Sequence, residues 1–494
     1  MRAFDPAIVF LSLAAIVCSA DAYRTSRQRV FLCYFASWSY YRVGDGKFSV
    51  EQIDATPCTH LIYAYAKPVN GSIAPMETRL DTDVHKMYRK FNALKRTRRG
   101  LKTLISIGGW NEGSERFSKI ASSERERRAF AESVVAFLDL HGFDGIDIDW
   151  KYPTQRDGSP NDKKNFALLL KDLRKALDHK DHILTASVSA LKAIIDAAYD
   201  VKEISRHVHF MSIMGYDLFG PWNYHTGHPA PLRGRIGGSS DESTLNVETS
   251  VESWISKGAD VGKLVLGMPL YGRTYTLKDP NEHGFNAPTW GPGESGPFTR
   301  EPGLLGYNEI CTLISTGGWK VTRDPNVNAP VAVKGNLWIG FDDAESLTNK
   351  VQLALDKGLA GAMVWSIETD DFRGKCGRGK NPLQEAIRKA LLLNASEPTM
   401  TTSEPTMTTS DPTMTTPEPT MTTSQHLTRS PVTNSPGLFK CVSEDRFPDP
   451  NTDTGYIWCV RRGSDFQLFK MRCPRGTFFR KHTRRCDHVY KNAL

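Results

Sequence analysis

The chain has 494 residues, of which 39% are hydrophobic and 24% charged, and its formal net charge is +8 at pH 7. This length suits one large domain with a smaller appendage. Much of the positive charge lies near the C-terminus and outside any motif of the nucleic-acid type, so we expect no nucleic-acid partner. No segment after the first 22 residues reaches about 18 uninterrupted apolar residues, so we expect no membrane span.

Residues 1–22 have the pattern of a secretory signal. An apolar run from Ala7 to Ala20 follows Arg2, and Ala20-Asp21-Ala22 supplies a small-x-small cleavage site. We therefore predict a secreted, extracellular protein. Of nine cysteines, Cys18 lies in the signal, and the even number of eight that remains favours disulfides. No C-x-x-C pair occurs, so we predict neither a metal site nor a cofactor.

Three regions of the mature chain differ in composition: 23–393, 394–436 and 437–494. The middle region repeats a seven-residue unit rich in Thr and Pro, beginning at Ser396. Because proline in every unit opposes helix and sheet formation, we expect a disordered, extended stalk that carries O-linked glycans, with an unmodified flexible linker as the alternative. Two sequons could carry N-glycans: Asn70 and Asn394.

The large region alternates candidate strands and helices. The strands are predicted from nearly continuous apolar runs, as expected for buried parallel strands: 29–35, 60–66, 102–109, 142–150, 183–189, 208–217, 263–270 and 361–368. Amphipathic helices are predicted at 124–140 and 163–178. Eight such β–α units predict an α/β fold, a (β/α)8 TIM barrel. The gap 271–360 is too long for one helix and predicts a small inserted α+β subdomain.

The fourth predicted strand carries an acidic row that ends in a lysine. Successive side chains of a strand point to opposite faces, so Asp147, Asp149 and Lys151 share one face. Charges along a buried strand are costly unless they are paired or used, which favours a functional site over scaffolding. In a TIM barrel the functional residues gather at the C-terminal ends of the strands, where this row lies.

Four motifs resemble those of the family-eighteen glycoside hydrolases, the chitinases and chitinase-like proteins. They lie in the family's order: Leu104-Ile-Ser-Ile-Gly-Gly-Trp110, Phe143-Asp-Gly-Ile-Asp-Ile-Asp-Trp-Lys-Tyr-Pro153, Met214-Gly-Tyr-Asp217 and Gly361-Ala-Met-Val-Trp365. The second is similar to D-G-x-D-x-D-W-E-Y-P, in which the glutamate is the proton donor. Here Lys151 stands in its place.

The resemblance implies a role for each position, because in this family the acetamido oxygen of the sugar attacks the anomeric carbon. Asp149 would orient the acetamido group, Tyr216 would hydrogen-bond its carbonyl, and Asp147 would hold the charge of Asp149. Trp365 would form the floor under the sugar. Further sugar-binding positions are implied as well: Trp38, Trp110, Asp217, Trp222, Tyr271 and Arg273.

Lysine is unsuited to the role of proton donor. The ordinary pKa of a lysine is near 10.4 and that of a glutamate near 4.3, a difference worth about 8 kcal/mol of proton-transfer driving force. We expect Lys151 instead to form an ion pair with Asp149. The prediction is therefore a protein that binds chitin without hydrolysing it. The alternatives are an active endochitinase that uses Lys151 or a relocated acid such as Glu368, and a barrel kept only for stability.

The C-terminal region resembles a peritrophin-A chitin-binding module that lacks one of its three bridges. Tyr456 and Trp458 are the candidates for stacking on N-acetylglucosamine rings, although they could instead pack a small core. The two resemblances imply four disulfides: Cys33–Cys58, Cys311–Cys376, Cys441–Cys459 and Cys473–Cys486. The layout is similar to that of arthropod chitinases and chitinase-like mite allergens. We expect a monomer whose partner is chitin or its oligomers.

Overall fold

The structure, a computed structural model, describes residues 29–393 and five strands between residues 445 and 488. The chain separates into two compact units, Met1–Pro398 and Thr399–Leu494, and each is described by itself. The predicted signal at 1–22 and the predicted linker at 394–436, with Asn394, lie outside the described residues.

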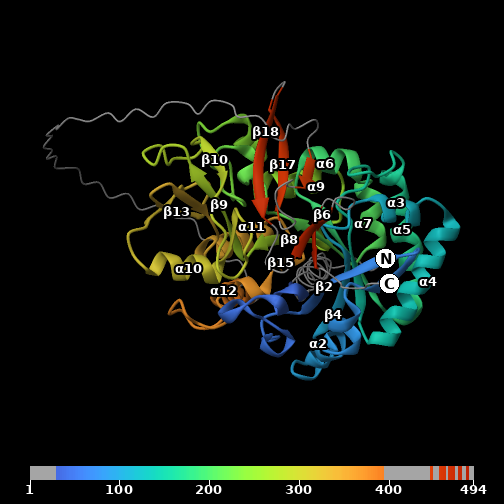
Figure 1. Ribbon diagram of the computed structural model, residues 1–494. Helices are drawn as coiled ribbons and strands as arrows, with labels where there is room; N and C mark the ends of the chain where they lie inside the picture. The colour runs from blue at the N-terminus through green and yellow to red at the C-terminus, as the bar shows by residue number, and fades with distance from the viewer. Residues whose placement is uncertain are drawn as a thin grey trace, which may run out of the picture. The chain divides into compact units, whose positions relative to one another are not determined.

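Within residues 29–393, eight parallel strands close into a barrel (Figure 1). They are β1 (Val30–Ala36), β2 (His60–Val69), β4 (Lys102–Gly108), β5 (Gly145–Asp149), β6 (Ile183–Ser189), β7 (Phe210–Met214), β8 (Leu264–Pro269) and β15 (Gly361–Trp365). Strand β1 pairs with both β2 and β15, so the barrel has no free edge. A short strand, β3 (Ser72–Pro75), folds back on β2. The predicted TIM barrel is confirmed, strand by strand.

Helices follow the barrel strands and cover the outside of the barrel. They are α2 (Met87–Ala93), α3 (Glu115–Ala121), α4 (Glu124–His141), α5 (Asp162–Leu177), α6 (Lys192–Ala198), α7 (Val201–His207), α8 (Ser240–Thr244), α9 (Val247–Ser256), α11 (Ala344–Asp356) and α12 (Pro382–Leu393). The sequence sets the ends of α4. The Ser123 side chain accepts the Glu126 N–H at the start, and Gly142 ends the helix with a φ of 76°.

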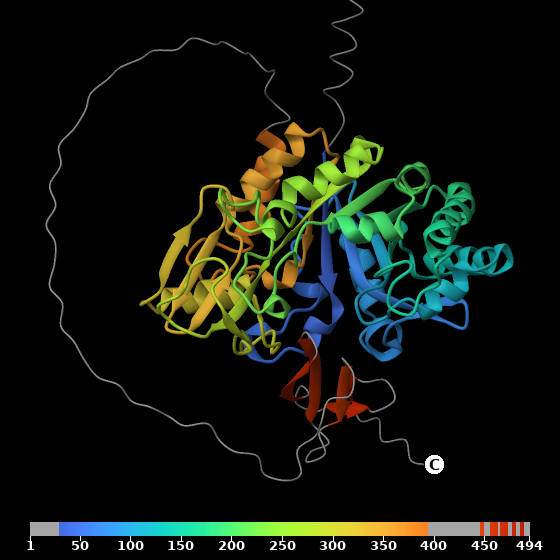
Figure 2. The ribbon, with the colours of Figure 1, turned by 90° about the horizontal axis from the view of Figure 1, so that it is seen from above.

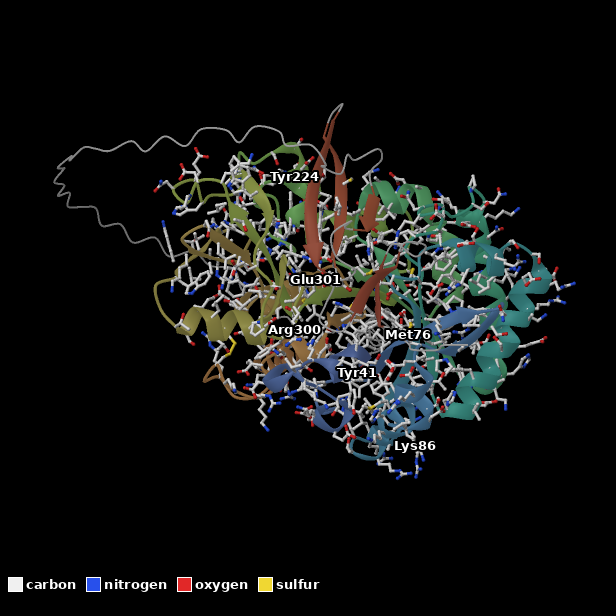
Figure 3. The ribbon with its side chains drawn as sticks, in the orientation of Figure 1. Tyr41, Met76, Lys86, Tyr224, Arg300 and Glu301 are labelled. Carbon is white, nitrogen blue, oxygen red and sulfur yellow. A yellow bond between two sulfur atoms is a disulfide. The ribbon has the colours of Figure 1, made fainter. Side chains whose placement is uncertain are left out.

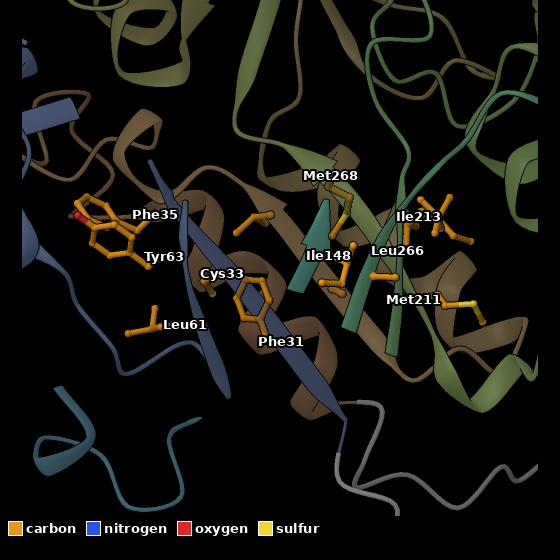
Figure 4. Close-up of a cluster of buried hydrophobic side chains, with 14 of the residues drawn as sticks. Phe31, Cys33, Phe35, Leu61, Tyr63, Ile148, Met211, Ile213, Leu266 and Met268 are labelled. Carbon is orange, nitrogen blue, oxygen red and sulfur yellow. The ribbon is translucent and has the colours of Figure 1, made fainter. Parts of the chain in front are cut away.

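The barrel has an inner and an outer apolar layer because the strand side chains alternate. Leu32 and Tyr34 of β1 point inward with Ile62, Leu104 and Met363. The residues between them point outward against the helices. Figure 4 shows this outer layer, in which Phe31, Cys33 and Phe35 of β1 lie beside Leu61 and Tyr63 of β2. Burial of each large apolar side chain contributes about 1.5–3 kcal/mol.

An α+β insertion follows β8 and carries its own small core. Its elements are β9 (Tyr271–Leu277), β10 (Thr289–Pro292), β11 (Leu304–Gly306), α10 (Tyr307–Ser315), β12 (Lys320–Arg323), β13 (Pro330–Lys334) and β14 (Leu337–Gly340). In Figures 1 and 2 the insertion lies across the barrel from α3, α4 and α5. These elements lie within the gap 271–360, and the last part of that gap is α11, which packs against β8 and β15 of the barrel.

Two predicted disulfides are present in the barrel unit. Cys33–Cys58 joins β1 to the segment before β2, with the Cα atoms 6.0 Å apart. Cys311–Cys376 joins α10 of the insertion to the segment before α12, with the Cα atoms 5.8 Å apart. Each bridge closes a loop and so restricts the unfolded chain.

In the C-terminal unit the described residues form strands. β16 (Asp445–Pro448), β17 (Gly455–Arg462) and β18 (Asp465–Arg472) make an antiparallel sheet, and β19 (Thr477–Arg480) pairs with β20 (Arg485–His488). Cys459 of β17 is disulfide-bonded. Cys441 and Cys473, which belong to the two bridges predicted here, lie outside the described residues. Among the described helices of the chain, none is both long enough and apolar enough to cross a membrane.

Candidate functional site

The acidic row lies at the C-terminal end of β5, as predicted. Asp147 is fully buried and accepts hydrogen bonds from Ser106 Oγ and Thr185 Oγ1, both at 2.8 Å, and from Ser187 Oγ at 3.2 Å. Burial, and then the neighbouring charge of Asp149, raise the pKa of Asp147 to about 6. The three hydroxyl groups of β4 and β6 therefore satisfy a carboxyl that the barrel interior would otherwise destabilise.

Lys151 forms an ion pair with Asp149. Its Nζ atom lies 2.6 Å from both Oδ1 and Oδ2 of that carboxylate. The Lys151 side chain is 14% exposed and the Asp149 side chain 2%. The pair predicted from the sequence is thus present, and it engages both oxygens of Asp149 at once.

Tyr65, which the sequence analysis did not select, also binds Asp149. Its hydroxyl donates to Asp149 Oδ2 at 2.9 Å. The Tyr65 ring stacks on Trp38 with the centroids 6.0 Å apart and on Trp365 with the centroids 5.8 Å apart. The predicted floor residue Trp365 and the predicted stacking residue Trp38 are therefore joined through Tyr65.

The two glycines at the end of β4 let the chain pack closely around Asp149. Gly108 has a φ of 116°, and a Cβ atom there would lie 2.3 Å from the carbonyl oxygen of Asp149. Gly109 has a φ of 83°, and a Cβ atom there would lie 2.7 Å from the ring of Tyr65. Both positions require glycine on grounds of conformation and of space. Gly109 N also donates to the Asp149 carbonyl at 2.9 Å.

A second ion pair joins Asp217, which follows β7, to Arg273 on β9 of the insertion. Asp217 accepts hydrogen bonds from Arg273 Nε and Arg273 Nη2 and from the Tyr271 hydroxyl, all at 2.8 Å. The Arg273 guanidinium also lies 5.1 Å from the ring centroid of Trp222. Glu301 of the insertion, labelled in Figure 3, is 4.0 Å from Arg273 Nη1. Four of the predicted binding positions are thus in one cluster.

Tyr216 is influenced by the charges of both Asp149 and Asp217. Its ring meets that of Tyr271 edge-on at 6.2 Å. Burial, followed by the charges of Asp149 and Asp217, raises the pKa of Tyr216, so its hydroxyl keeps its proton and can donate. This matches the donor role that the family resemblance implies.

Trp110 and Arg156 form a further contact at the end of β4. The Arg156 guanidinium lies 4.3 Å from the ring centroid of Trp110, and its Nη1 atom donates to the Trp110 carbonyl at 2.6 Å and to the Lys151 carbonyl at 3.2 Å. Arg156 was not selected from the sequence. Trp110 is 57% exposed, and Trp38 and Trp222 are each 45% exposed, so all three indoles are open to a ligand.

Glu368 does not lie where a proton donor to a sugar would need to be. Its side chain is 1% exposed, accepts hydrogen bonds from Ser366 Oγ at 2.5 Å and Ala36 N at 3.2 Å, and lies 3.6 Å from Arg42. Burial raises the pKa of Glu368, and the charge of Arg42 opposes this shift. The structure therefore argues against the alternative in which Glu368 replaces the missing acid.

In the C-terminal unit, Tyr456 and Trp458 lie two residues apart on β17 and so share one face of the strand. Both are half-buried, whereas Ile457 and Cys459, on the other face, are buried. The alternation separates a buried face from a half-buried aromatic face.

One group of potential metal ligands occurs among the described residues, formed by Cys311, Asp371 and Cys376. The two cysteines are joined in a disulfide, so their sulfur atoms are not available as thiolate ligands. The group lies between the insertion and the segment before α12, apart from the acidic row.

Comparisons with known proteins place this barrel and site in a family. The model of glycosyl hydrolases family 18 matches residues 30–370, and that of the chitin binding peritrophin-A domain matches residues 441–493. The chain belongs to glycosyl hydrolase family 18 and carries a chitin-binding domain of the peritrophin-A type.

The proteins similar to the barrel include chitinases and a pseudo-chitinase. The probable chitinase 10 of Drosophila melanogaster is 39% identical over 369 residues, which cover 73% of this chain and 16% of that protein. The structure of Ostrinia furnacalis Group IV chitinase, 39% identical, matches with a TM-score of 0.72 over 74% of this chain and all of that one. Human YKL-39, described as a pseudo-chitinase with retained chitooligosaccharide binding, is 37% identical and has a TM-score of 0.69 over 74% of this chain and 99% of its own.

Proposed function

We propose that this protein binds chitin oligomers at the C-terminal ends of the barrel strands and does not hydrolyse them. Family membership and the peritrophin-A domain support chitin as the ligand. The relatives include a chitinase and a pseudo-chitinase, so family membership alone does not decide between catalysis and binding. The lysine at position 151 supports binding without hydrolysis.

The observation that carries the proposal is the double contact of Lys151 with Asp149, at 2.6 Å to each oxygen. Substrate-assisted cleavage requires an acid that protonates the leaving oxygen and a carboxylate that is free to orient the acetamido group. Lysine is an ammonium donor with an ordinary pKa about six units above that of glutamate, which removes the acid. The same ammonium contacts both oxygens of Asp149, so this carboxylate is not free to orient the acetamido group.

The aromatic and polar residues that we assign to binding support the proposal. Trp38, Trp110 and Trp222 would stack on the apolar faces of successive sugar rings, and Trp365 would lie under the central one. The Asp217–Arg273 pair and the Tyr216 hydroxyl would hydrogen-bond the hydroxyl and acetamido groups. Loss of catalysis without loss of these contacts gives a binding protein rather than a decayed barrel.

The C-terminal unit would add a second sugar-binding surface. Tyr456 and Trp458, on the half-buried aromatic face of β17, are its stacking residues in this proposal. Two binding sites on one tethered chain raise the overall affinity for a polymer without any new contact. We further propose that the protein is a secreted, monomeric glycoprotein. Asn70, which is exposed in the turn between β2 and β3, is available for glycosylation.

The test compares the natural protein with Lys151→Glu and Lys151→Gln on a chitin tetramer. Restoring the acid in Lys151→Glu should raise the release of reducing ends by about 10³-fold, the usual contribution of a general acid. Lys151→Gln, the matched control, removes the ammonium without adding an acid and should stay inactive. Equal turnover by the natural protein and Lys151→Glu would refute the proposal.

A further inference from the structure

Tyr65 occupies an irregular position in its strand. Ala64 of β2 pairs with Ser106 of β4, and Ala66 pairs with Ile107, so Tyr65 is the extra residue of a β-bulge. Regular alternation would place Tyr65 on the same face as Tyr63, which packs among the helices against Phe35. The bulge turns Tyr65 to the other side, toward Asp149 and Trp365, and such bulges commonly re-aim one side chain beside a site.

The Tyr65 ring is held in place on several sides. Trp38 and Trp365 stack against it with interplanar angles of 17° and 25°. The backbone of Gly109 closes a third side, so closely that a Cβ atom there would lie 2.7 Å from the ring. The residue is only 8% exposed. Its hydroxyl therefore has a fixed direction, which is toward Asp149.

The hydroxyl is a permanent donor to that carboxylate. Burial, and then the charge of Asp149, raise the pKa of Tyr65, so the phenol keeps its proton. Its bond to Asp149 Oδ2 is 2.9 Å long, and the same oxygen also accepts from Lys151. A hydrogen bond to an ionised acceptor is about twice as strong as one between neutral groups.

We propose that Tyr65 is a positioning residue that restrains Asp149 independently of Lys151. The inference rests on the proposed function, because it assumes that a restrained Asp149 suppresses the reaction. Replacing Lys151 by Glu would then release only part of the restraint, since the Tyr65 hydroxyl would still occupy Oδ2. The full return of hydrolysis would require both changes.

The experiment adds Tyr65→Phe to Lys151→Glu and measures kcat and KM on the chitin tetramer. Loss of one charge-assisted hydrogen bond should raise kcat about tenfold, while KM changes less than threefold because the ring is kept. The matched control is Tyr63→Phe in the same background. Tyr63 lies two residues away, and its hydroxyl donates to Asp81 Oδ1 at 2.6 Å in a buried position. That variant loses a comparable bond and should leave kcat unchanged.

A kcat that stays the same or falls in the double variant overturns the role of Tyr65. If the natural protein already hydrolyses the chitin tetramer as fast as Lys151→Glu does, the proposed function fails. The role of Tyr65 is then tested by introducing Tyr65→Phe into the natural protein. Tyr65→Phe must then still raise kcat about tenfold. If no variant, the double one included, releases reducing ends, the restraint is not what suppresses the reaction and the inference is overturned.

Discussion

The barrel unit contains two lysine–aspartate pairs of almost the same geometry in very different surroundings. Lys151 lies 2.6 Å from both oxygens of Asp149, and Lys350 lies 2.5 and 2.6 Å from those of Asp342. Both side chains of the second pair have no exposed surface, whereas Lys151 is 14% exposed among accessible aromatic rings. The second contact is thus part of the buried interior of the fold, whereas the first lies where the proposed function places the sugar.

The surroundings of the second pair explain its structural role. Ser346 Oγ also donates to Asp342 at 2.7 Å, and His228 packs nearby as a neutral ring. Burial lowers the pKa of Lys350, and the carboxylate of Asp342 opposes this effect. The geometry of an ion pair alone thus says little about function. Solvent access and a position at the C-terminal ends of the barrel strands are better indicators of a functional role.

The largest expected difference between the two ion pairs is in stability, and it is measured by replacing each lysine with methionine. Lys350→Met leaves the Asp342 charge buried without its partner and should lower the free energy of unfolding by about 3–5 kcal/mol. Lys151→Met should cost less than this, because the Lys151 side chain is partly exposed and Asp149 keeps the hydrogen bond from the Tyr65 hydroxyl. Urea unfolding of both variants measures the difference. Similar losses would show that Lys151 is as structural as Lys350.

A second prediction concerns acid stability beside the Lys350 pair. Burial lowers the pKa of His228 to about 4; the charge of Asp342 opposes this shift and the charge of Lys350 adds to it. The neutral ring donates from Nε2 to the Phe341 carbonyl and accepts the Ala230 N–H at Nδ1. A protonated ring could still donate from Nε2 but could not accept at Nδ1. Between pH 6.5 and 4 the unfolded chain therefore binds a proton that the folded chain refuses, and stability falls as the pH falls.

The variant His228→Gln removes this titration. The stability advantage of the natural protein over the variant should shrink by about 3 kcal/mol between pH 7.5 and pH 4. Denaturant unfolding at the two pH values measures the change, and the other buried groups are common to both proteins and cancel. A pH-independent difference would show that His228 is protonated in both states or in neither.

The smallest predicted effect concerns binding at the acidic row. Trp38→Ala should weaken the affinity for the chitin tetramer about tenfold, because one stacking surface is lost. Trp290→Ala is a fitting control, since Trp290 on β10 is 61% exposed and was not among the predicted binding residues. Calorimetric titration gives both dissociation constants. Equal losses at the two positions would contradict the assignment of Trp38 to the site.

The sequence predicted the barrel well because strands that are buried on both faces appear as continuous apolar runs. Alternation within β5 correctly placed Asp147 and Asp149 side by side on one face, with Lys151 beyond them. The same rule failed at Tyr65, because a bulge in β2 reverses its direction and leaves no signal in a single sequence. A bulge depends on how two strands pair, which periodicity along one strand cannot show.

The contacts of two other residues, Glu368 and Arg156, could not be predicted from the sequence. Glu368 follows Trp365 closely in the sequence, yet the short helix Ile367–Thr369 turns its carboxylate toward Ala36 and Arg42 of another part of the barrel. Arg156 lies in a loop, and its contact with Trp110 joins the ends of two strands. Both outcomes depend on loop geometry, which residue type and spacing leave open.

The most direct test of the account uses the natural protein alone. Purified protein is incubated with a chitin tetramer, and the dissociation constant and the release of reducing ends are measured on the same sample. We predict saturable binding with no release above the uncatalysed background, because the position of the family's proton donor holds an ammonium that is paired with Asp149. Brisk release of reducing ends, or no binding at all, would contradict it.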